Sequence, residues 1–111
     1  VTSGRLRGLA VTGDRRLSLA PDLPTISEAG IKGYEASTWY GLLVPAATPV
    51  DIINRLHATT VKILALDDLK KRLESSGFQG IGSTPKEYAA YTTSEIEKWA
   101  KVIKAAGIRA D

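Results

Sequence analysis

The sequence of 111 residues predicts an α/β fold on the strength of three observations. Two short runs, residues 6–12 and 38–44, have the β-branched, aromatic and aliphatic content of buried strands. Threonine-proline pairs mark where helices begin, and glycines follow the expected ends of these helices. Strands that alternate with capped helices are typical of a layered α/β domain.

The first predicted strand, residues 6–12, ends at Gly13, and the second covers residues 38–44. Residues 78–82 are compatible with a short third strand. Residues 14–24 combine charges with two prolines and show no clear period, which indicates a loop.

Two helices are predicted after residue 47. In the first, Thr48 occupies the N-cap and Pro49 the first helical position. Asp67 or Asp68 is expected to cap the second, and Gly77 to end it. The first helix should be half-buried, because a period near 3.6 relates Ile53, Leu56, Thr60, Ile63 and Leu64.

A third, longer helix has the clearest start signal. Thr84 and Glu87 form a capping box around Pro85, and the helix should run to about Ala106 and end at Gly107. Trp99 is expected to be a core residue, because it lies on the predicted apolar stripe. That stripe comprises Tyr88, Thr92, Ile96, Trp99, Ile103 and Ala106.

A short helix is also expected to begin at Thr25. Glu28, three places later, completes a capping box, and Gly30 follows as the stop. The first N–H groups of a helix have no partner within it, and they carry positive partial charge.

Composition excludes several classes of function. The net charge of +3 is too small to require a polyanionic partner, and the absence of cysteine excludes disulfides and thiolate chemistry. No apolar run approaches the ~20 residues that span a bilayer, so membrane insertion is not expected. A chain without methionine that begins Val-Thr-Ser-Gly is expected to be a fragment or a processed protein.

The sequence shows neither a catalytic nor a metal-binding constellation. His57 is the only histidine, and no serine or carboxylate spacing marks it as part of a triad. Asp67, Asp68 and Glu74 fit no calcium loop. We therefore expect no enzyme, no metal and no cofactor. The basic residues are expected to lie in a solvated loop rather than bind nucleic acid, and they are Arg5, Arg7, Arg15 and Arg16.

Five motifs follow one another in a specific order: LRGLAVT, PDLPT, TWYGLLVP, GSTPKEY and EIEKWAKVIKAAGI. Together they resemble the second half of the Bug/TctC family of extracytoplasmic solute-binding proteins. The resemblance implies part of a type II periplasmic-binding-protein fold. Residues 1–36 would end the second lobe, residues 37–47 would be the hinge-crossing strand, and residues 48–111 would be the C-terminal part of the first lobe.

The resemblance also implies a function. The chain would be the C-terminal fragment of a periplasmic protein that captures small carboxylates for the membrane subunits of a tripartite tricarboxylate transporter. The alternative is a solute-sensing module that presents its ligand to a two-component sensor.

Three ligand-binding candidates follow from the resemblance. Members of the family hold carboxylates with backbone amides and hydroxyls, so the resemblance implies that Pro24 and Thr25, at the expected helix start, contact the ligand. The simpler interpretation is that Thr25 only caps its helix. Trp39, on the hinge strand, is the third candidate, and packing in the core is the alternative. At most one of Trp39 and Tyr40 can face a ligand, because adjacent strand residues point in opposite directions.

A piece cut from a two-lobed protein should expose strand edges and apolar helix faces. We therefore expect copies of the chain to form a homodimer or exchange strands, with residues 38–44 as the hinge. We also expect the isolated piece to bind ligand weakly or not at all.

Overall fold

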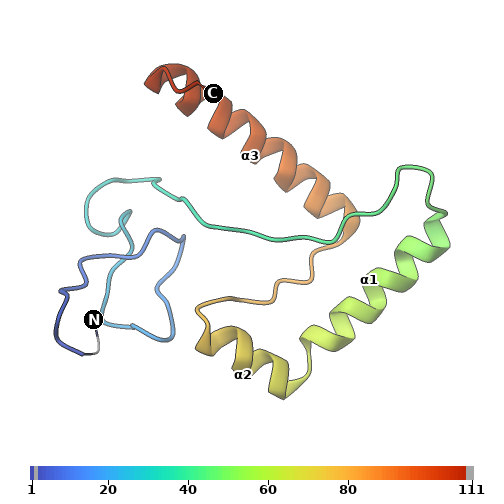
Figure 1. The fold of residues 1–111 in the computed structure, drawn as a ribbon, viewed down its shortest axis with the longest axis horizontal. Helices are drawn as coiled ribbons and strands as arrows, with labels where there is room; N and C mark the ends of the chain where they lie inside the picture. The colour runs from blue at the N-terminus through green and yellow to red at the C-terminus, as the bar shows by residue number, and fades with distance from the viewer. Residues whose placement is uncertain (2, 110–111) are drawn as a thin grey trace. The chain divides into compact units, whose positions relative to one another are not determined.

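The computed structural model describes residues 1 and 3–109. Its regular structure consists of three α-helices: α1 (Val50–Leu64), α2 (Asp67–Ser75) and α3 (Pro85–Ala106). Figure 1 shows α1 in green, α2 in yellow and α3 in orange to red. The chain divides into two compact units, one made of Val1–Tyr40 with Ala65–Gly80 and the other of Gly41–Leu64 with the segment from Ile81 on.

Helix α3 forms as its sequence predicts. Thr84 is the N-cap, its hydroxyl oxygen accepts the Glu87 N–H, and the Glu87 carboxylate accepts the Thr84 N–H in return. Pro85 occupies the first position, where the missing N–H costs nothing. The helix ends at Gly107, whose φ of 65° lies in the left-handed region that glycine tolerates.

The predicted apolar stripe of α3 is only partly correct. Tyr88 and Thr92 are half-buried, but the buried residue of this helix is Glu95, and Ile96 is exposed. Trp99 is 40% exposed rather than a core residue. Its indole N–H donates a 2.9 Å hydrogen bond to Glu95 Oε2, which explains how a carboxylate can lie on the covered face.

Helix α2 contains Leu69 and Leu73, and its N-cap differs from the predicted one. The N-cap is Leu66, which makes no side-chain cap hydrogen bond, so the prediction that Asp67 or Asp68 caps the helix is wrong. Both aspartates lie in the first helical turn instead, where negative charge stabilises the helix dipole. At the other end Gly77 adopts a φ of 76°, as a stop residue should.

Helix α1 begins at Val50, directly after Pro49, whose carbonyl accepts the first helical N–H groups. The covered positions repeat at helical spacing, although Leu56 and Ile63 of the predicted set are more exposed than the rest. Gly82 of the same unit packs beside this helix, because a Cβ there would lie 3.4 Å from Val61 Cγ2. The half-buried residues are Ile53, His57, Thr60 and Leu64.

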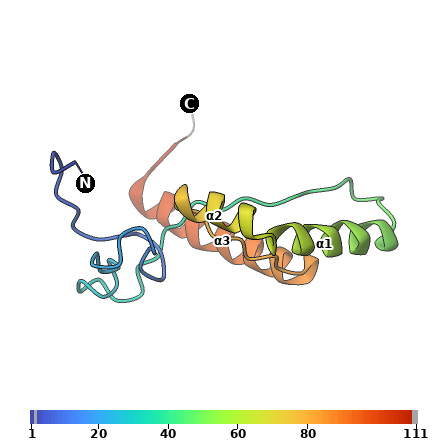
Figure 2. The same ribbon diagram turned by 90° about the horizontal axis from the view of Figure 1, so that it is seen from below.

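The predicted strands at residues 6–12, 38–44 and 78–82 are wrong for this structure. Within residues 1 and 3–109 the β-structure is one parallel bridge between Val11 and Thr25. Figures 1 and 2 accordingly show the N-terminal segment as a coil without strand arrows. A strand requires a neighbouring strand for its N–H and C=O groups, and within residues 1 and 3–109 the predicted strands form no ladder beyond that bridge.

The predicted burial of the two apolar runs is also wrong. Leu9 is 75% exposed, and Leu42 and Leu43 are 76% and 84% exposed. No apolar side chain of the described residues is buried. Residues 6–12 and 38–44 therefore have the composition of buried strands, but the described residues form no sheet that could bury them.

Among the residues that the structure describes, no helix combines the length and the apolar character that crossing a membrane requires. The two compact units do not test the lobe boundaries expected at residues 1–36, 37–47 and 48–111, which stay predictions.

Candidate functional site

The first two ligand candidates, Pro24 and Thr25, lie together in a tight turn that we call the Thr25 turn (residues 24–30). No regular helix forms there, contrary to the prediction; a single helical turn does, with the Ala29 N–H donating to the Thr25 carbonyl at 2.9 Å. Gly30 adopts a φ of 123° just after it. One turn is too short to sustain a helix, because nucleation fixes several residues for one hydrogen bond.

The capping box predicted for Thr25 is present. The Glu28 N–H donates to Thr25 Oγ1 at 3.0 Å, and Glu28 Oε2 accepts the Thr25 N–H at 2.8 Å. Thr25 is only 3% exposed, so its polar atoms meet partners inside the protein. The hydroxyl of Thr25 accepts one hydrogen bond here and retains its own hydrogen for donation.

The N-terminal segment holds the Thr25 turn from the other side. The Val11 N–H donates to the Pro24 carbonyl, and the Ile26 N–H donates to the Val11 carbonyl, both at 2.9 Å. These two bonds form the parallel bridge between Val11 and Thr25. The first amides of the turn are thus already bonded, to Glu28 at Thr25 and to Val11 at Ile26.

Arg16 adds a charged partner that the sequence did not reveal. Its Nε donates to Glu28 Oε2 at 2.9 Å, and its Nη1 donates to the Pro21 carbonyl at 3.2 Å. As the sequence predicts, Arg16 is exposed and lies in an irregular segment, but it also makes this specific contact. The contact spans twelve residues of irregular chain, and no periodic pattern in the sequence signals it.

The pKa of the Glu28 carboxyl lies below its usual value of 4.5. The hydrogen bond from the Thr25 N–H is the largest cause, and the hydrogen bond from the Arg16 side chain comes next. Both favour the ionised carboxylate. The turn is therefore stabilised by an internal anion at its first amide.

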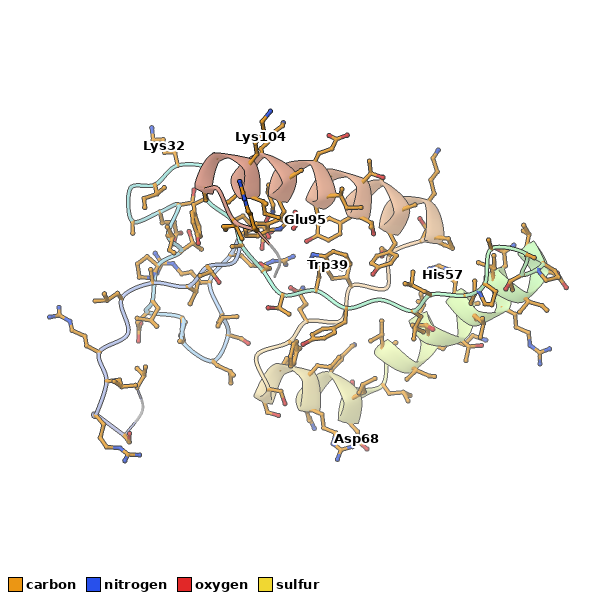
Figure 3. All side chains as sticks on the ribbon, turned by 45° about the horizontal axis from the view of Figure 1, so that its top comes forward. Lys32, Trp39, His57, Asp68, Glu95 and Lys104 are labelled. Carbon is orange, nitrogen blue, oxygen red and sulfur yellow. The ribbon has the colours of Figure 1, made fainter. Side chains whose placement is uncertain are left out.

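Trp39, the third candidate, follows further along the chain of the same unit and is 37% exposed. Figure 3 labels it on the extended segment, with His57 on α1 and Glu95 on α3. Its neighbour Tyr40 meets Phe78 edge-on, with ring centroids 5.7 Å apart. The structure thus joins Pro24 and Thr25 in one turn and places Trp39 on a separate segment.

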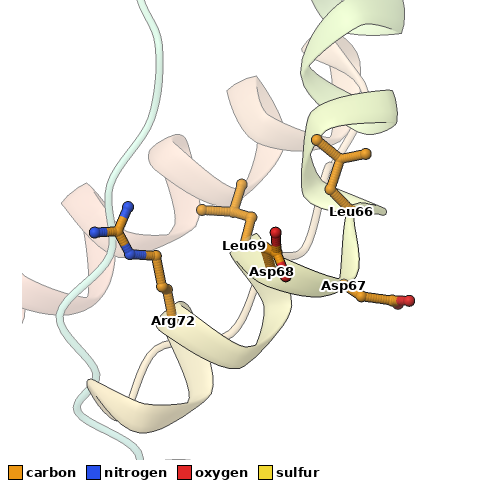
Figure 4. A pocket seen from close by; sticks show the side chains of 5 residues that line it. All are labelled: Leu66, Asp67, Asp68, Leu69 and Arg72. Carbon is orange, nitrogen blue, oxygen red and sulfur yellow. The ribbon is translucent and has the colours of Figure 1, made fainter.

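A shallow depression of about 380 Å³ lies at the start of α2, and none of the three candidates lines it. Figure 4 shows its residues: the Asp68 carboxylate lies near Leu69, whereas the Asp67 side chain points away from Leu69 and Arg72. Within residues 1 and 3–109, no group of three acidic, histidine or cysteine side chains could hold a metal ion. The depression offers no arrangement of groups that converges on a ligand.

His57 has a structural contact. Its Nε2 lies 3.3 Å from the Gly82 carbonyl oxygen within one unit, which ties α1 to the segment that precedes α3. This contact gives His57 a structural role within its unit.

The chain is similar to known proteins over nearly its whole length. Residues 1–108 match the family model described as "Tripartite tricarboxylate transporter family receptor". A UPF0065 protein from Pseudomonas sp. (strain P51), encoded in the tcbD-tcbE intergenic region, is 36% identical over 104 residues, which are 93% of this chain and 31% of the relative. The protein BugT of Bordetella pertussis is 28% identical over 98% of this chain and 33% of its own length.

Solved structures give the same result. The R. palustris protein Rpa4515, determined with adipate, is 36% identical with a TM-score of 0.79, over 96% of this chain and 36% of that one. The periplasmic binding protein BugD is 30% identical with a TM-score of 0.81, over all of this chain and 38% of that one. The chain thus spans about a third of the length of each of these four proteins, which is consistent with part of a periplasmic-binding fold.

Proposed function

Because this chain belongs to the Bug/TctC family of tripartite tricarboxylate transporter receptors, we propose that it works as the C-terminal part of a periplasmic solute-binding protein that captures small carboxylates. Its partners would be the membrane subunits of a tripartite transporter. The family is one of receptors, and we propose no catalytic role and no cofactor for this chain.

One observation carries the proposed ligand class. The structural neighbour determined with adipate is 36% identical to this chain over 96% of its length. Adipate is a dicarboxylate with a four-carbon apolar spacer, so its recognition needs hydrogen-bond donors for the two ends and an apolar contact between them. Similarity at this level supports the same class of ligand, a small dicarboxylate, for the protein that contains this chain.

Pro24, Thr25 and Trp39 are the proposed ligand contacts. The Thr25 N–H is bonded to Glu28, so the group that Thr25 could direct at a ligand carboxylate is its hydroxyl hydrogen. Pro24 lacks an N–H and would contribute an apolar surface. Trp39 would supply a larger one, suited to the methylenes of a dicarboxylate.

Isothermal titration of the protein, at the full length of its relatives, tests this function. We expect heat with adipate and none with adipamide, which has the same shape and no charge. Thr25→Val should weaken adipate binding about tenfold, the equivalent of one hydrogen bond to a charged group. Thr25→Ser, which keeps the hydroxyl, should bind nearly as the unchanged protein does. Heat with neither adipate nor any other di- or tricarboxylate would overturn the proposal.

We further propose that the 111-residue chain by itself associates into homodimers, by pairing or exchange of residues 38–44. The apolar side chains that stay exposed there support this proposal, because unpaired apolar segments of extended chain favour pairing with a second copy. In the full-length protein the same residues would form the crossing strand between lobes.

A further inference from the structure

Arg16 joins two parts of the chain that flank the proposed ligand contacts. One arm of its guanidinium bonds the Pro21 carbonyl, just before the Thr25 turn, and the other bonds Glu28 inside that turn. Glu28 Oε2 also accepts the Thr25 N–H. Arg16 therefore connects the chain before the Thr25 turn with the turn itself, and Pro24 and Thr25 lie in the sequence between the two residues that Arg16 contacts.

The adjacent arginine makes no such connection. Arg15 pairs with its chain neighbour Asp14 at 3.6 Å, a contact between two well-exposed side chains that fixes nothing beyond residues 14 and 15. Arginine presents several N–H donors in a rigid planar fork, so one residue can hold a carboxylate and a carbonyl at once. A lysine at position 16 would keep the charge and lose this fork.

We propose that Arg16 is a positioning residue for the ligand site: by holding Glu28 and the Pro21 carbonyl together, it fixes the conformation in which Pro24 and Thr25 face the carboxylate ligand. This inference rests on the proposed function and names a residue that acts on the site without touching the ligand. Glu28 is the link, because its carboxylate bonds the Thr25 N–H and the Arg16 side chain through the same oxygen.

Nuclear magnetic resonance of the 111-residue chain tests, without any ligand, whether Arg16 fixes the Thr25 turn through Glu28. In Arg16→Gln, the titration midpoint of Glu28 should rise and the Thr25 amide should exchange faster with solvent. Arg15→Gln is the matched control, since it removes the same charge from the neighbouring residue, and it should change neither quantity. Arg16→Lys should fall between the unchanged chain and Arg16→Gln. A loss of stability alone would not move the Glu28 midpoint of the folded chain.

Adipate titration of the full-length protein tests the consequence for the site. Arg16→Gln should weaken binding about tenfold, as the loss of a charged hydrogen bond does when its effect reaches the site in full, whereas Arg15→Gln should not. The acidic limb of the affinity profile should also move to higher pH in Arg16→Gln. Adipate's own carboxyl groups are protonated in the same acidic range in every variant, so only the difference between the Arg16→Gln and Arg15→Gln profiles is assigned to Glu28, whose carboxylate Arg16 contacts.

The resonance and titration experiments distinguish a failure of the proposed function from a failure of the role proposed for Arg16. If the unchanged protein binds no carboxylate, the proposed function fails, and the resonance arm alone decides whether Arg16 fixes the turn. If adipate binds and Arg16→Gln behaves as Arg15→Gln does in affinity and pH profile, Arg16 is not a positioning residue. An unchanged Glu28 midpoint in Arg16→Gln would overturn the proposal in either case.

Discussion

The backbone of Gly41 lies directly on the ring of Tyr88: a Cβ added to Gly41 would be 2.1 Å from both Cζ and the phenolic oxygen. Both residues belong to the same compact unit. Glycine weakens an extended apolar segment, yet here it lets the backbone approach α3 more closely than any other residue could. The contact places the backbone of Gly41 against the first turn of α3.

Gly41→Ala should therefore destabilise the chain by about 1–3 kcal/mol, the usual cost of overpacking, because the ring must move to admit the methyl group. Urea unfolding followed by circular dichroism measures this. Gly13→Ala is the matched control, since its nearest neighbour would be 3.5 Å away, an ordinary contact.

A double-mutant cycle assigns the effect to the pair. Gly41→Ala should cost much less in a Tyr88→Ala background, because the ring that it strikes is gone. An equal cost in both backgrounds would show that the methyl group disturbs something other than Tyr88.

The capping box at the start of α3 makes a second prediction. Thr84→Ala removes the hydroxyl oxygen that accepts the Glu87 N–H at 3.2 Å, and it should lower stability by about 1 kcal/mol. Thr84→Ser keeps the acceptor, and it should leave stability nearly unchanged because serine caps helices at least as well as threonine. Helical circular dichroism during urea unfolding distinguishes them, and equal midpoints for the two variants would contradict the role of the cap.

The pH dependence of α3 makes a third prediction. Hydrogen bonds from the Thr84 backbone N–H and then from the Thr84 hydroxyl hold the pKa of Glu87 below 4.5. A depressed native pKa means that the ionised carboxylate stabilises the fold above the unfolded value. That stabilisation should disappear as the pH falls from about 4.5 through the lower native pKa.

Glu87→Gln tests the origin of this dependence. Glutamine cannot ionise, so the variant should lose helical structure less steeply between neutral and acidic pH than the unchanged chain does. Lys86→Gln, which alters a neighbouring charge on the same turn, is the control. Identical acid unfolding of the unchanged chain and Glu87→Gln would exclude Glu87 as a source.

The self-association proposed above is tested by light scattering coupled to gel filtration. The 111-residue chain should elute as a dimer or larger species at high concentration. Leu43→Lys, which places a charge on an 84% exposed apolar residue, should shift it toward monomer. Ile31→Lys is a control at another exposed apolar position. A stable monomer at high concentration would refute the proposal.

The sequence by itself determined where α3 begins and where α2 and α3 end. The Thr84 box, Gly107 and Gly77 act on atoms within about four residues, so their signals are complete in the local sequence. The Thr25 box is equally local and is present in the structure, although the helix that it was expected to start is only one turn long. The prediction of an aspartate cap for α2 was wrong because aspartate is also favourable inside the first turn.

Tertiary structure alone decided the contacts between distant residues. Nothing in the sequence links Arg16 to Glu28 or Gly41 to Tyr88, because no periodic pattern relates a residue on an irregular segment to a distant residue. The apolar runs specify side chains suited to a sheet, but a strand exists only when another backbone bonds to it. Composition therefore indicates that residues 38–44 suit a strand, whereas a paired strand requires a second backbone beside them, which only tertiary structure can supply.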